Sequence, residues 1–433
     1  MEQVRGLRPG RAGRKDHQRM KVLLISAELK KNRGAAGAGT SLEELWRLAE
    51  TAGLEPVQKL TVRVQAWNPA TLVGSGKVEE LKALVQETGA GAVIFDEELT
   101  PGQGRNLEKA LGVNVADRPR LIIDIFAMRA RTREGKLQAR LAGFNYALSR
   151  LGGKGGSMDQ QRGMIGGRGS GEKKLEYDKR ELRVKISELE EEIDSIKRER
   201  HTQRAQRDAV PMPQVSIVGY TNAGKSTLLN CLTGAGHVYA DDKLFATLDP
   251  TTKRVRLPAG GWALFTDTVG FIQKLPHDLI AAFRATLEEI RYSDLILHVH
   301  DLSSPEARRQ HDAVKATLEE LGIKDIPVIN VFNKADAVKD PAVSAWAPER
   351  MRPVFMSALT GEGADRLLAA AERALSARWG DYELIVPAGS KGLIKEIYSS
   401  CLVKDADYGQ EGVTLKFKAT PENYARLKKK AGA

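Results

Sequence analysis

The segment with the clearest chemistry in this 433-residue chain lies at 219–226 and has the spacing G-x-x-x-x-G-K-S. An apolar run precedes it and a helix-forming run follows it, so it has the strand–loop–helix context that a phosphate-binding P-loop requires. Its glycines would let backbone N–H groups face phosphate oxygens, its lysine would reach the β- and γ-phosphates, and its serine would bind Mg²⁺. The predicted nucleotide-binding residues of this loop are Gly219, Tyr220, Thr221, Asn222, Ala223, Gly224, Lys225, Ser226 and Thr227.

Later segments supply candidates for Mg²⁺ and for the γ-phosphate. Asp267 ends an apolar run, so its carboxylate would bind Mg²⁺ through water, and the N–H of Gly270 would bind the γ-phosphate. A threonine before Asp267 would close over both and release when phosphate leaves, as in GTPase switches. Thr247 is the preferred residue, with Thr251 and Thr252 as alternatives. The predicted metal ligands are Ser226, Thr247 and Asp267, and the predicted catalytic residues are Lys225, Thr247 and Gly270.

The Asn-Lys-Ala-Asp segment at 333–336 also follows an apolar run and predicts selection of guanine. The carboxylate of Asp336 would accept the imino and amino N–H groups of guanine, an edge that adenine does not offer. Lys334 would lie along the base, and Asn333 would brace the loops. Ser357 and Ala358 fit the loop whose N–H contacts the guanine carbonyl. These motifs, in this order, predict a domain that binds and hydrolyses GTP.

Phe271 directly follows the Asp-x-x-Gly segment, where well-known small GTPases carry a glutamine that orients the attacking water. Because a phenyl ring cannot orient water by hydrogen bonding, we expect slow hydrolysis until a partner, another side chain or K⁺ completes the site. Asn222 stands at a position that would help to hold such a K⁺ ion.

The composition favours a cytoplasmic protein, expected to be monomeric, with a polyanionic partner. The formal net charge is +11, which favours nucleic acid over a membrane surface, although ordinary solubility would also account for it. Cys231 and Cys401 are the only cysteines and lie far apart, which is typical of a reducing compartment and argues against a structural disulfide or a zinc site. No apolar run has the length of a membrane span.

The predicted fold class is α/β, with a P-loop GTPase domain as its centre. We expect a disordered basic tail at 1–20, a small parallel α/β domain at 21–130, a long helical hairpin at 131–210, the GTP-binding domain at 211–379 and a small α+β domain at 380–433. Apolar residues at heptad spacing predict the second helix of the hairpin.

The hairpin would carry a glycine-rich loop at 152–171 at its tip. Two interpretations stay open for this loop. It is either an unstructured connector or a basic loop, with Arg162 and Arg168, that enters a crowded RNA surface where glycine removes steric bulk.

Two further segments carry structural expectations. The segment at 34–41 resembles a P-loop but has Thr40 in place of the lysine, so we interpret it as a loop before a helix. The C-terminal pattern predicts strand, helix and strand at 384–386, 392–398 and 413–417, with the lysines at 428–430 as a solvated tail.

Together these residues resemble the HflX family of ribosome-associated GTPases over nearly the whole chain after the basic tail. The resemblance rests on the segments at 74–81, 124–126 with 134–138, 168–172, 246–251 and 266–271, the last of which includes Phe271. Ser170 departs from the family, which usually has proline there.

This resemblance implies a GTP-controlled factor that binds the large ribosomal subunit, with the hairpin loop on ribosomal RNA near the peptidyl-transferase region. Related members split stalled ribosomes, and some hydrolyse ATP through the N-terminal domain, for which the segment at 34–41 gives no support. Two alternatives stay open. One is an RNA-binding or ribosome-assembly platform in which the nucleotide is a structural ligand, and the other is a nucleotide-driven RNA remodeller.

Overall fold

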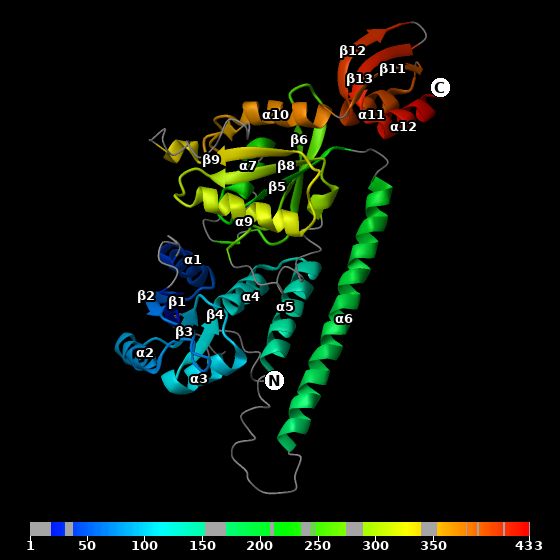
Figure 1. Cartoon of the computed structure of the whole chain (residues 1–433). Coiled ribbons are helices and arrows are strands. Elements are labelled where there is room, and N and C mark those ends of the chain that lie inside the picture. Colours follow the sequence, from blue (N-terminus) through cyan, green and yellow to red (C-terminus); the bar gives the residue numbers. More distant parts are fainter. Residues whose placement is uncertain are drawn as a thin grey trace. The chain divides into compact units, whose positions relative to one another are not determined.

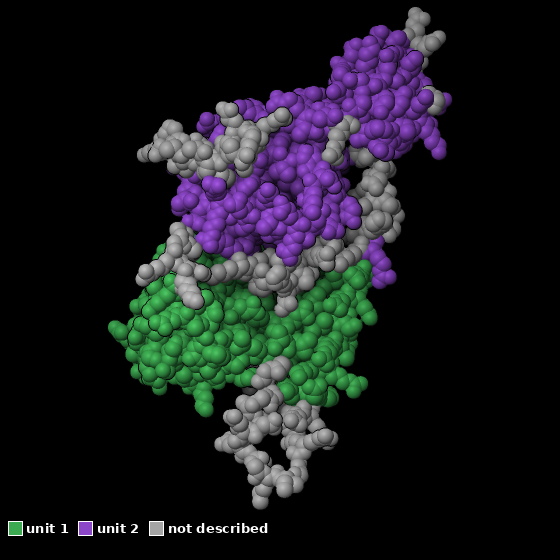
Figure 2. Space-filling model, in the orientation of Figure 1, with its two compact units in different colours: residues 1–195, 274–283 green, residues 196–273, 284–433 purple. Residues whose placement is uncertain are grey.

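The computed structural model places most of the chain in regular structure (Figure 1). It describes residues 19–30, 38–151, 170–207, 212–234, 244–245, 247–273, 289–338, 353–377, 379–387, 389–409 and 412–432. Most of the expected basic tail and of the glycine-rich loop therefore lies outside the described residues. The chain divides into two compact units, 1–195 with 274–283 and 196–273 with 284–433 (Figure 2). Among the described helices, none combines the length and apolarity needed to span a bilayer.

The first unit contains the predicted parallel sheet, with strand order β2-β1-β3-β4 and parallel pairing throughout. Its strands are β1 (Lys21–Leu29), β2 (Glu55–Val64), β3 (Ala92–Phe95) and β4 (Asn114–Asp117). Its helices are α1 (Ala38–Thr51), α2 (Ser75–Thr88), α3 (Pro101–Leu111) and α4 (Arg118–Arg129). Thr100 and Gln103 form a capping box at the start of α3, which fixes where that helix begins.

The helical hairpin consists of α5 (Arg133–Leu151) and α6 (Ser170–Arg207). Arg133, at the first residue of α5, donates to Glu192 in the second half of α6, so the two helices run antiparallel as predicted. Leu189 and Ile193, two of the apolar residues at heptad spacing in α6, are each about 5% exposed, so this part of the helix is packed rather than fully solvated.

The second unit is built on a six-stranded sheet with the order β10-β9-β8-β5-β7-β6, parallel except for β6. The strands are β5 (Gln214–Gly219), β6 (Thr251–Arg256), β7 (Trp262–Asp267), β8 (Leu295–Asp301), β9 (Val328–Asn333) and β10 (Val354–Phe355). The helices are α7 (Lys225–Thr233), α9 (Ala307–Glu320) and α10 (Ala364–Ser376), with 3₁₀ turns at η3 (Glu289–Tyr292) and η4 (Ala335–Ala337).

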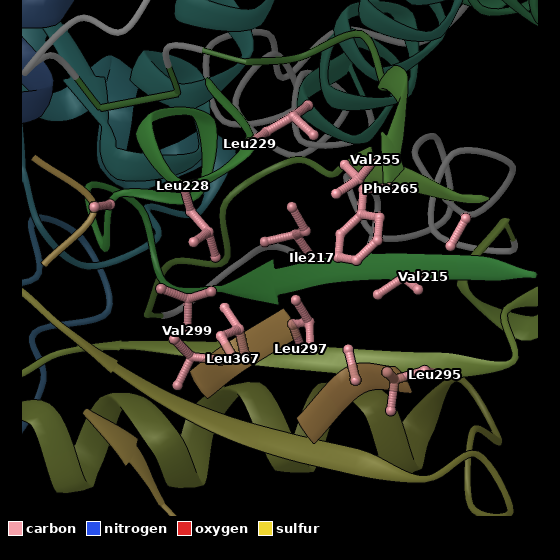
Figure 3. Close-up of a cluster of buried hydrophobic side chains, with 14 of the residues drawn as sticks. Val215, Ile217, Leu228, Leu229, Val255, Phe265, Leu295, Leu297, Val299 and Leu367 are labelled. Carbon is pink, nitrogen blue, oxygen red and sulfur yellow. The ribbon is translucent and has the colours of Figure 1, made fainter. Parts of the chain in front are cut away.

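A buried apolar cluster fixes the central strands of this sheet (Figure 3). Ile217 of β5, Phe265 of β7 and Leu297 of β8 pack with Leu228 of α7 and Leu367 of α10. Because β5, β7, β8 and β9 are parallel, their carboxyl ends lie at one edge, which is where ligands bind in such sheets. The P-loop, the Asp-x-x-Gly segment and the Asn-Lys-x-Asp segment follow the carboxyl ends of β5, β7 and β9, and Ser357 follows β10.

The C-terminal part of the second unit contains more strands and helices than the sequence predicted. It contains an antiparallel sheet of β11 (Gly380–Pro387), β12 (Leu402–Tyr408) and β13 (Gly412–Ala419) in the order β11-β13-β12, with helices α11 (Lys391–Ser400) and α12 (Pro421–Ala431). The predicted strand, helix and strand correspond to β11, α11 and β13, so β12 and α12 were missed. A register shift between Val403 and Asp405 interrupts the alternation that would have indicated β12.

The lysines at 428–430 are exposed as predicted, but the prediction that they form a tail is wrong, because they lie in α12. Thr420 caps α12 through a bond from the N–H of Asn423, Pro421 occupies the first turn, and Leu427 is completely buried. Lys430 also forms an ion pair with Glu396 of α11. The lysines therefore belong to a packed helix that begins with a recognisable capping signal.

Candidate nucleotide site

Two glycines of the P-loop lie where no side chain would fit. Gly219 ends β5 with a φ of 155°, and a Cβ there would lie 2.3 Å from the carbonyl oxygen of Val299 on β8. Gly224 precedes α7 with a φ of 90°, and a Cβ there would lie 2.2 Å from the Nδ2 atom of Asn333. Close backbone approach, together with the positive φ, accounts for both glycines.

The other predicted loop residues lie between these two glycines or in the first turn of α7. The N–H of Thr221 donates to the carbonyl of Phe271, and the hydroxyl of Tyr220 accepts from the N–H of Gln273. Asn222 has a φ of 61°, and the carbonyl of Ala223 accepts from Asn333. Thr227 follows Ser226 on α7. These contacts join the loop to the segment after β7 and to the end of β9.

Lys225 is buried beneath the loop. Its Nζ atom donates to the carbonyl oxygens of Gly219 and Tyr220, at 3.1 and 2.8 Å. Burial lowers the pKa of Lys225 to about 8, whereas the nearby carboxylate of Asp267 acts in the opposite direction. A Cβ on Gly270 would lie 3.0 Å from this Nζ atom, so the ammonium group is held directly beside the Asp-x-x-Gly segment.

Three oxygen-bearing side chains from three separate segments meet at the end of β7. The Oδ2 atom of Asp267 accepts from the hydroxyl of Ser226 at 2.6 Å and from that of Thr247 at 2.9 Å, and the two hydroxyls are 2.8 Å apart. Burial raises the pKa of Asp267, while Lys225 and the two hydroxyls lower it. Among the described residues, the buried Oδ1 atom of Asp267 has no hydrogen-bond partner. A cluster of hard oxygen donors around a buried carboxylate is the chemistry that suits Mg²⁺.

The alternative threonines lie elsewhere. Thr251 begins β6 opposite Asp267 in the β6–β7 register, and the hydroxyl of Thr252 bonds to that of Thr266. The structure therefore brings Thr247, rather than either alternative, to the Ser226 and Asp267 side chains.

At the other end of the site, Asn333 connects two loops. Its Nδ2 atom donates to the carbonyl of Ala223 at 2.9 Å, and its Oδ1 atom accepts from the N–H of Ala358 at 2.8 Å. Ser357 is completely buried beside Ala358, and Asp336 is exposed in the η4 turn. The residues predicted to contact the base thus lie on adjoining loops, held together by one amide.

Lys334 has a partner that the sequence analysis missed. Its φ is 62°, and its ammonium group lies 2.7 Å from the Oδ2 atom of Asp301 at the end of β8. In the sequence Asp301 is visible only as the acidic residue that ends β8, and its pairing with Lys334 depends on the adjacency of β8 and β9. Asp301 fixes the direction of the Lys334 side chain.

Phe271 is a structural residue of the site. Its side chain is about 4% exposed, its N–H donates to the carbonyl of Gly219 at 3.1 Å, and its carbonyl accepts from Thr221 at 2.8 Å. The backbone therefore holds the segment after β7 alongside the P-loop, while the phenyl ring is buried.

We predict that Phe271→Gln lowers the stability of the protein and does not accelerate basal GTP hydrolysis. The substitution replaces buried phenyl area with an amide that must be desolvated, which costs roughly 3 kcal/mol. Phe271→Leu is the matched apolar control, with a cost of about 1 kcal/mol. Denaturant unfolding and basal turnover of both variants test this prediction. Faster hydrolysis by Phe271→Gln at unchanged stability would contradict it.

The strand–loop–helix phosphate loop, the oxygen cluster at the end of β7 and the Asn-Lys-x-Asp segment at the end of β9 define a P-loop GTPase of the guanine-specific type. Four family models match the chain in sequence. They are described as GTP-binding GTPase N-terminal at 39–127, GTP-binding GTPase Middle Region at 129–207, 50S ribosome-binding GTPase at 214–334 and HflX C-terminal domain at 342–433.

The chain belongs to the HflX family of GTPases and is a GTP-hydrolysing enzyme. It is 45% identical over 388 residues to the GTPase HflX of Caldanaerobacter subterraneus subsp. tengcongensis, covering 90% of this chain and 89% of that one. It is 40% identical over 395 residues to the GTPase HflX of Escherichia coli K12, covering 90% and 92%. A GTP-binding protein from Sulfolobus solfataricus, solved in complex with GDP, aligns at 23% identity with a TM-score of 0.44, covering 83% and 99%.

Proposed function

We propose that this GTPase binds the large ribosomal subunit under the control of its nucleotide and thereby dissociates or rescues stalled ribosomes in the cytoplasm. The observation that carries the proposal is the meeting of Thr247 with Ser226 and Asp267, because it links a loop residue to the P-loop and to the Asp-x-x-Gly segment at one point. Membership of the HflX family and the match of residues 214–334 to a 50S ribosome-binding GTPase model support the choice of partner. The positive net charge suits ribosomal RNA.

Each predicted residue then has a role in holding GTP or GDP. The loop N–H groups at 219–227 bind the phosphates, the ammonium group of Lys225 neutralises the β- and γ-phosphates, and the N–H of Gly270 detects the γ-phosphate. Ser226, Thr247 and Asp267 would hold Mg²⁺, which when bound neutralises phosphate charge. Asp336 selects guanine, Lys334 covers the base, and Ser357 and Ala358 present the N–H groups that meet the guanine carbonyl. Asn222 is the residue that would assist a K⁺ ion.

Thr247 is the switch residue of this proposal. Its hydroxyl donates to Asp267 and lies 2.8 Å from that of Ser226, so its position depends on the charge and ligands at that point. Loss of the γ-phosphate removes contacts that hold the Thr247 segment closed. The resulting movement of this segment alters a surface that the ribosome contacts. Since Phe271 places no hydrogen-bonding group beside the attacking water, contact with the ribosome completes the catalytic site.

Nucleotide control requires that the two nucleotide forms differ in affinity for the subunit, because a ligand shifts an equilibrium only by its differential affinity for two states. We expect the monomeric protein to bind purified large subunits at least about tenfold more tightly with a non-hydrolysable GTP analogue than with GDP, a difference of about 1.4 kcal/mol. Co-sedimentation across a range of subunit concentrations measures both constants. Equal constants would exclude the switch and leave a platform with a structural nucleotide. Activity on naked RNA would instead indicate an RNA remodeller.

A further inference from the structure

A cluster of three histidines lies in the second unit, outside the nucleotide site. His298 and His300 occupy alternate positions of β8, so both side chains point to the same face of the sheet. This face is opposite to the one from which Leu295, Leu297 and Val299 enter the apolar core (Figure 3). The helix α9 contacts β8 and contributes His311 to the cluster.

The three rings are close enough to share one ligand. The ring centroid of His298 lies 4.0 Å from that of His300 and 5.0 Å from that of His311, and the centroids of His300 and His311 are 5.1 Å apart. One ring nitrogen from each residue lies within 4.8 Å of the other two. Zinc–imidazole bonds of about 2.0–2.1 Å place ligand nitrogens roughly 3.4 Å apart. Displacements of the ring nitrogens by about an ångström would therefore bring all three within bonding distance of one ion. His311 is only half-buried, which gives it room to turn and gives an ion a route of entry.

A neighbouring amide orients one of these rings as a metal ligand would require. The Nε2 atom of His300 lies 3.1 Å from the Oδ1 atom of Asn330 on β9. Since this amide oxygen only accepts, the pair places the proton on Nε2, so Nδ1 would be the nitrogen that binds an ion. Hydrogen bonding of the second ring nitrogen to an oxygen is the usual support for a metal-bound histidine.

The protonation states are also compatible with metal binding. Burial lowers the pKa of His298 well below its ordinary value and that of His300 to about 4, and it lowers the pKa of His311 as well. The three imidazoles are therefore neutral at physiological pH, which is the form that coordinates metals. Three neutral rings packed together only for their apolar area are the competing explanation.

We propose that His298, His300 and His311 form a binding site for a divalent transition-metal ion of the Zn²⁺ class. Three imidazole nitrogens and one water give the tetrahedral set that zinc prefers, and such nitrogen donors discriminate against Mg²⁺, which prefers the oxygen cluster at Asp267. The low cysteine content had argued against zinc, but the ligands of this site are histidines. A metal here would fasten α9 to β8 one residue before Asp301, the partner of Lys334.

The test is the binding of Zn²⁺ and Co²⁺ to the purified full chain, free of nucleotide and in excess Mg²⁺, followed by calorimetry and by the absorption spectrum of bound Co²⁺. We expect one equivalent of Zn²⁺ and a tetrahedral Co²⁺ spectrum. His311→Ala should weaken binding by at least about 100-fold, and Asn330→Ala should weaken it by roughly 10- to 100-fold. His201→Ala, which removes a histidine from α6, is the matched control and should bind like the original chain. His311 is half-buried, and circular dichroism of the variant establishes that it folds.

Two results would overturn the proposal. The first is no binding of Zn²⁺ by the folded original chain. The second is binding of equal strength by the original chain and by His311→Ala, which would place the ion elsewhere. Binding lost in His311→Ala and kept in His201→Ala supports the proposed site and is independent of ribosome binding, so its outcome is separate from that of the proposed function.

Discussion

Lys225→Met should reduce GTP hydrolysis by about 10²- to 10³-fold, the effect typical of removing one preorganised charge at a site where negative charge develops. Methionine keeps most of the volume of the lysine stem but has no ammonium group, so the packing beneath the P-loop is retained. The loss follows from the position of the Nζ atom, which is buried beneath the carbonyls of Gly219 and Tyr220 and beside Gly270. In the variant, a water molecule at the position of the ammonium group would have to reorient as negative charge develops, whereas the ammonium group of Lys225 is already in place.

Single-turnover hydrolysis at saturating GTP measures this effect, and thermal unfolding verifies that the variant folds. The matched control is Lys315→Met on α9, where the lysine side chain is 65% exposed and pairs only loosely with Glu319. We expect the control to retain the original rate. A folded Lys225→Met variant with a rate within about threefold of the original would contradict the assignment of Lys225 to the phosphates.

Asp336→Asn should change the base preference of the enzyme. In its proposed role the carboxylate would accept two N–H groups of guanine, whereas an amide in its place offers one acceptor oxygen and an unwanted NH2 donor group. Losing such charged hydrogen bonds costs about 3–5 kcal/mol, so GTP affinity should fall roughly 10²- to 10⁴-fold. Xanthine has a carbonyl where guanine has an amino group, so the amide N–H of the variant would pair with it and the affinity for xanthosine triphosphate should rise.

Competition of the two triphosphates against a fluorescent nucleotide measures both affinities. Asp365→Asn, at an exposed position in the first turn of α10, controls for loss of charge and should change neither affinity. If Asp336→Asn binds GTP as the original chain does, another residue selects the base.

The nucleotide segments could be located from the sequence because each has a fixed internal spacing and follows a short apolar run. The parallel order of β5, β7, β8 and β9 was implied by apolar runs that each end in a polar motif. Thr247 was preferred over Thr251 and Thr252 from the sequence, but only the structure shows that its hydroxyl reaches Asp267. The role of Phe271 in joining the loops was also not predictable from its side chain, because the backbone makes both of its hydrogen bonds.

Features that depend on contacts between distant residues were missed for the same reason. Asp301 and Lys334 are far apart in sequence and meet only because β8 and β9 are adjacent. The histidine cluster combines alternate residues of β8 with a residue of α9, a pattern without a fixed spacing. In the C-terminal part of the second unit, a register shift interrupts the alternation of β12. The helix α12 is an exception, because Thr420 and Pro421 are local signals from which its start could have been predicted.

The measurement that tests the central claim most directly is the rate of GTP hydrolysis with and without purified large ribosomal subunits. The original chain and Lys225→Met should be compared at equal concentration. We expect slow turnover alone and a stimulation of at least about tenfold by the subunits, which Lys225→Met does not show. An unchanged rate in the presence of subunits that demonstrably bind the protein would contradict a catalytic site completed by the ribosome.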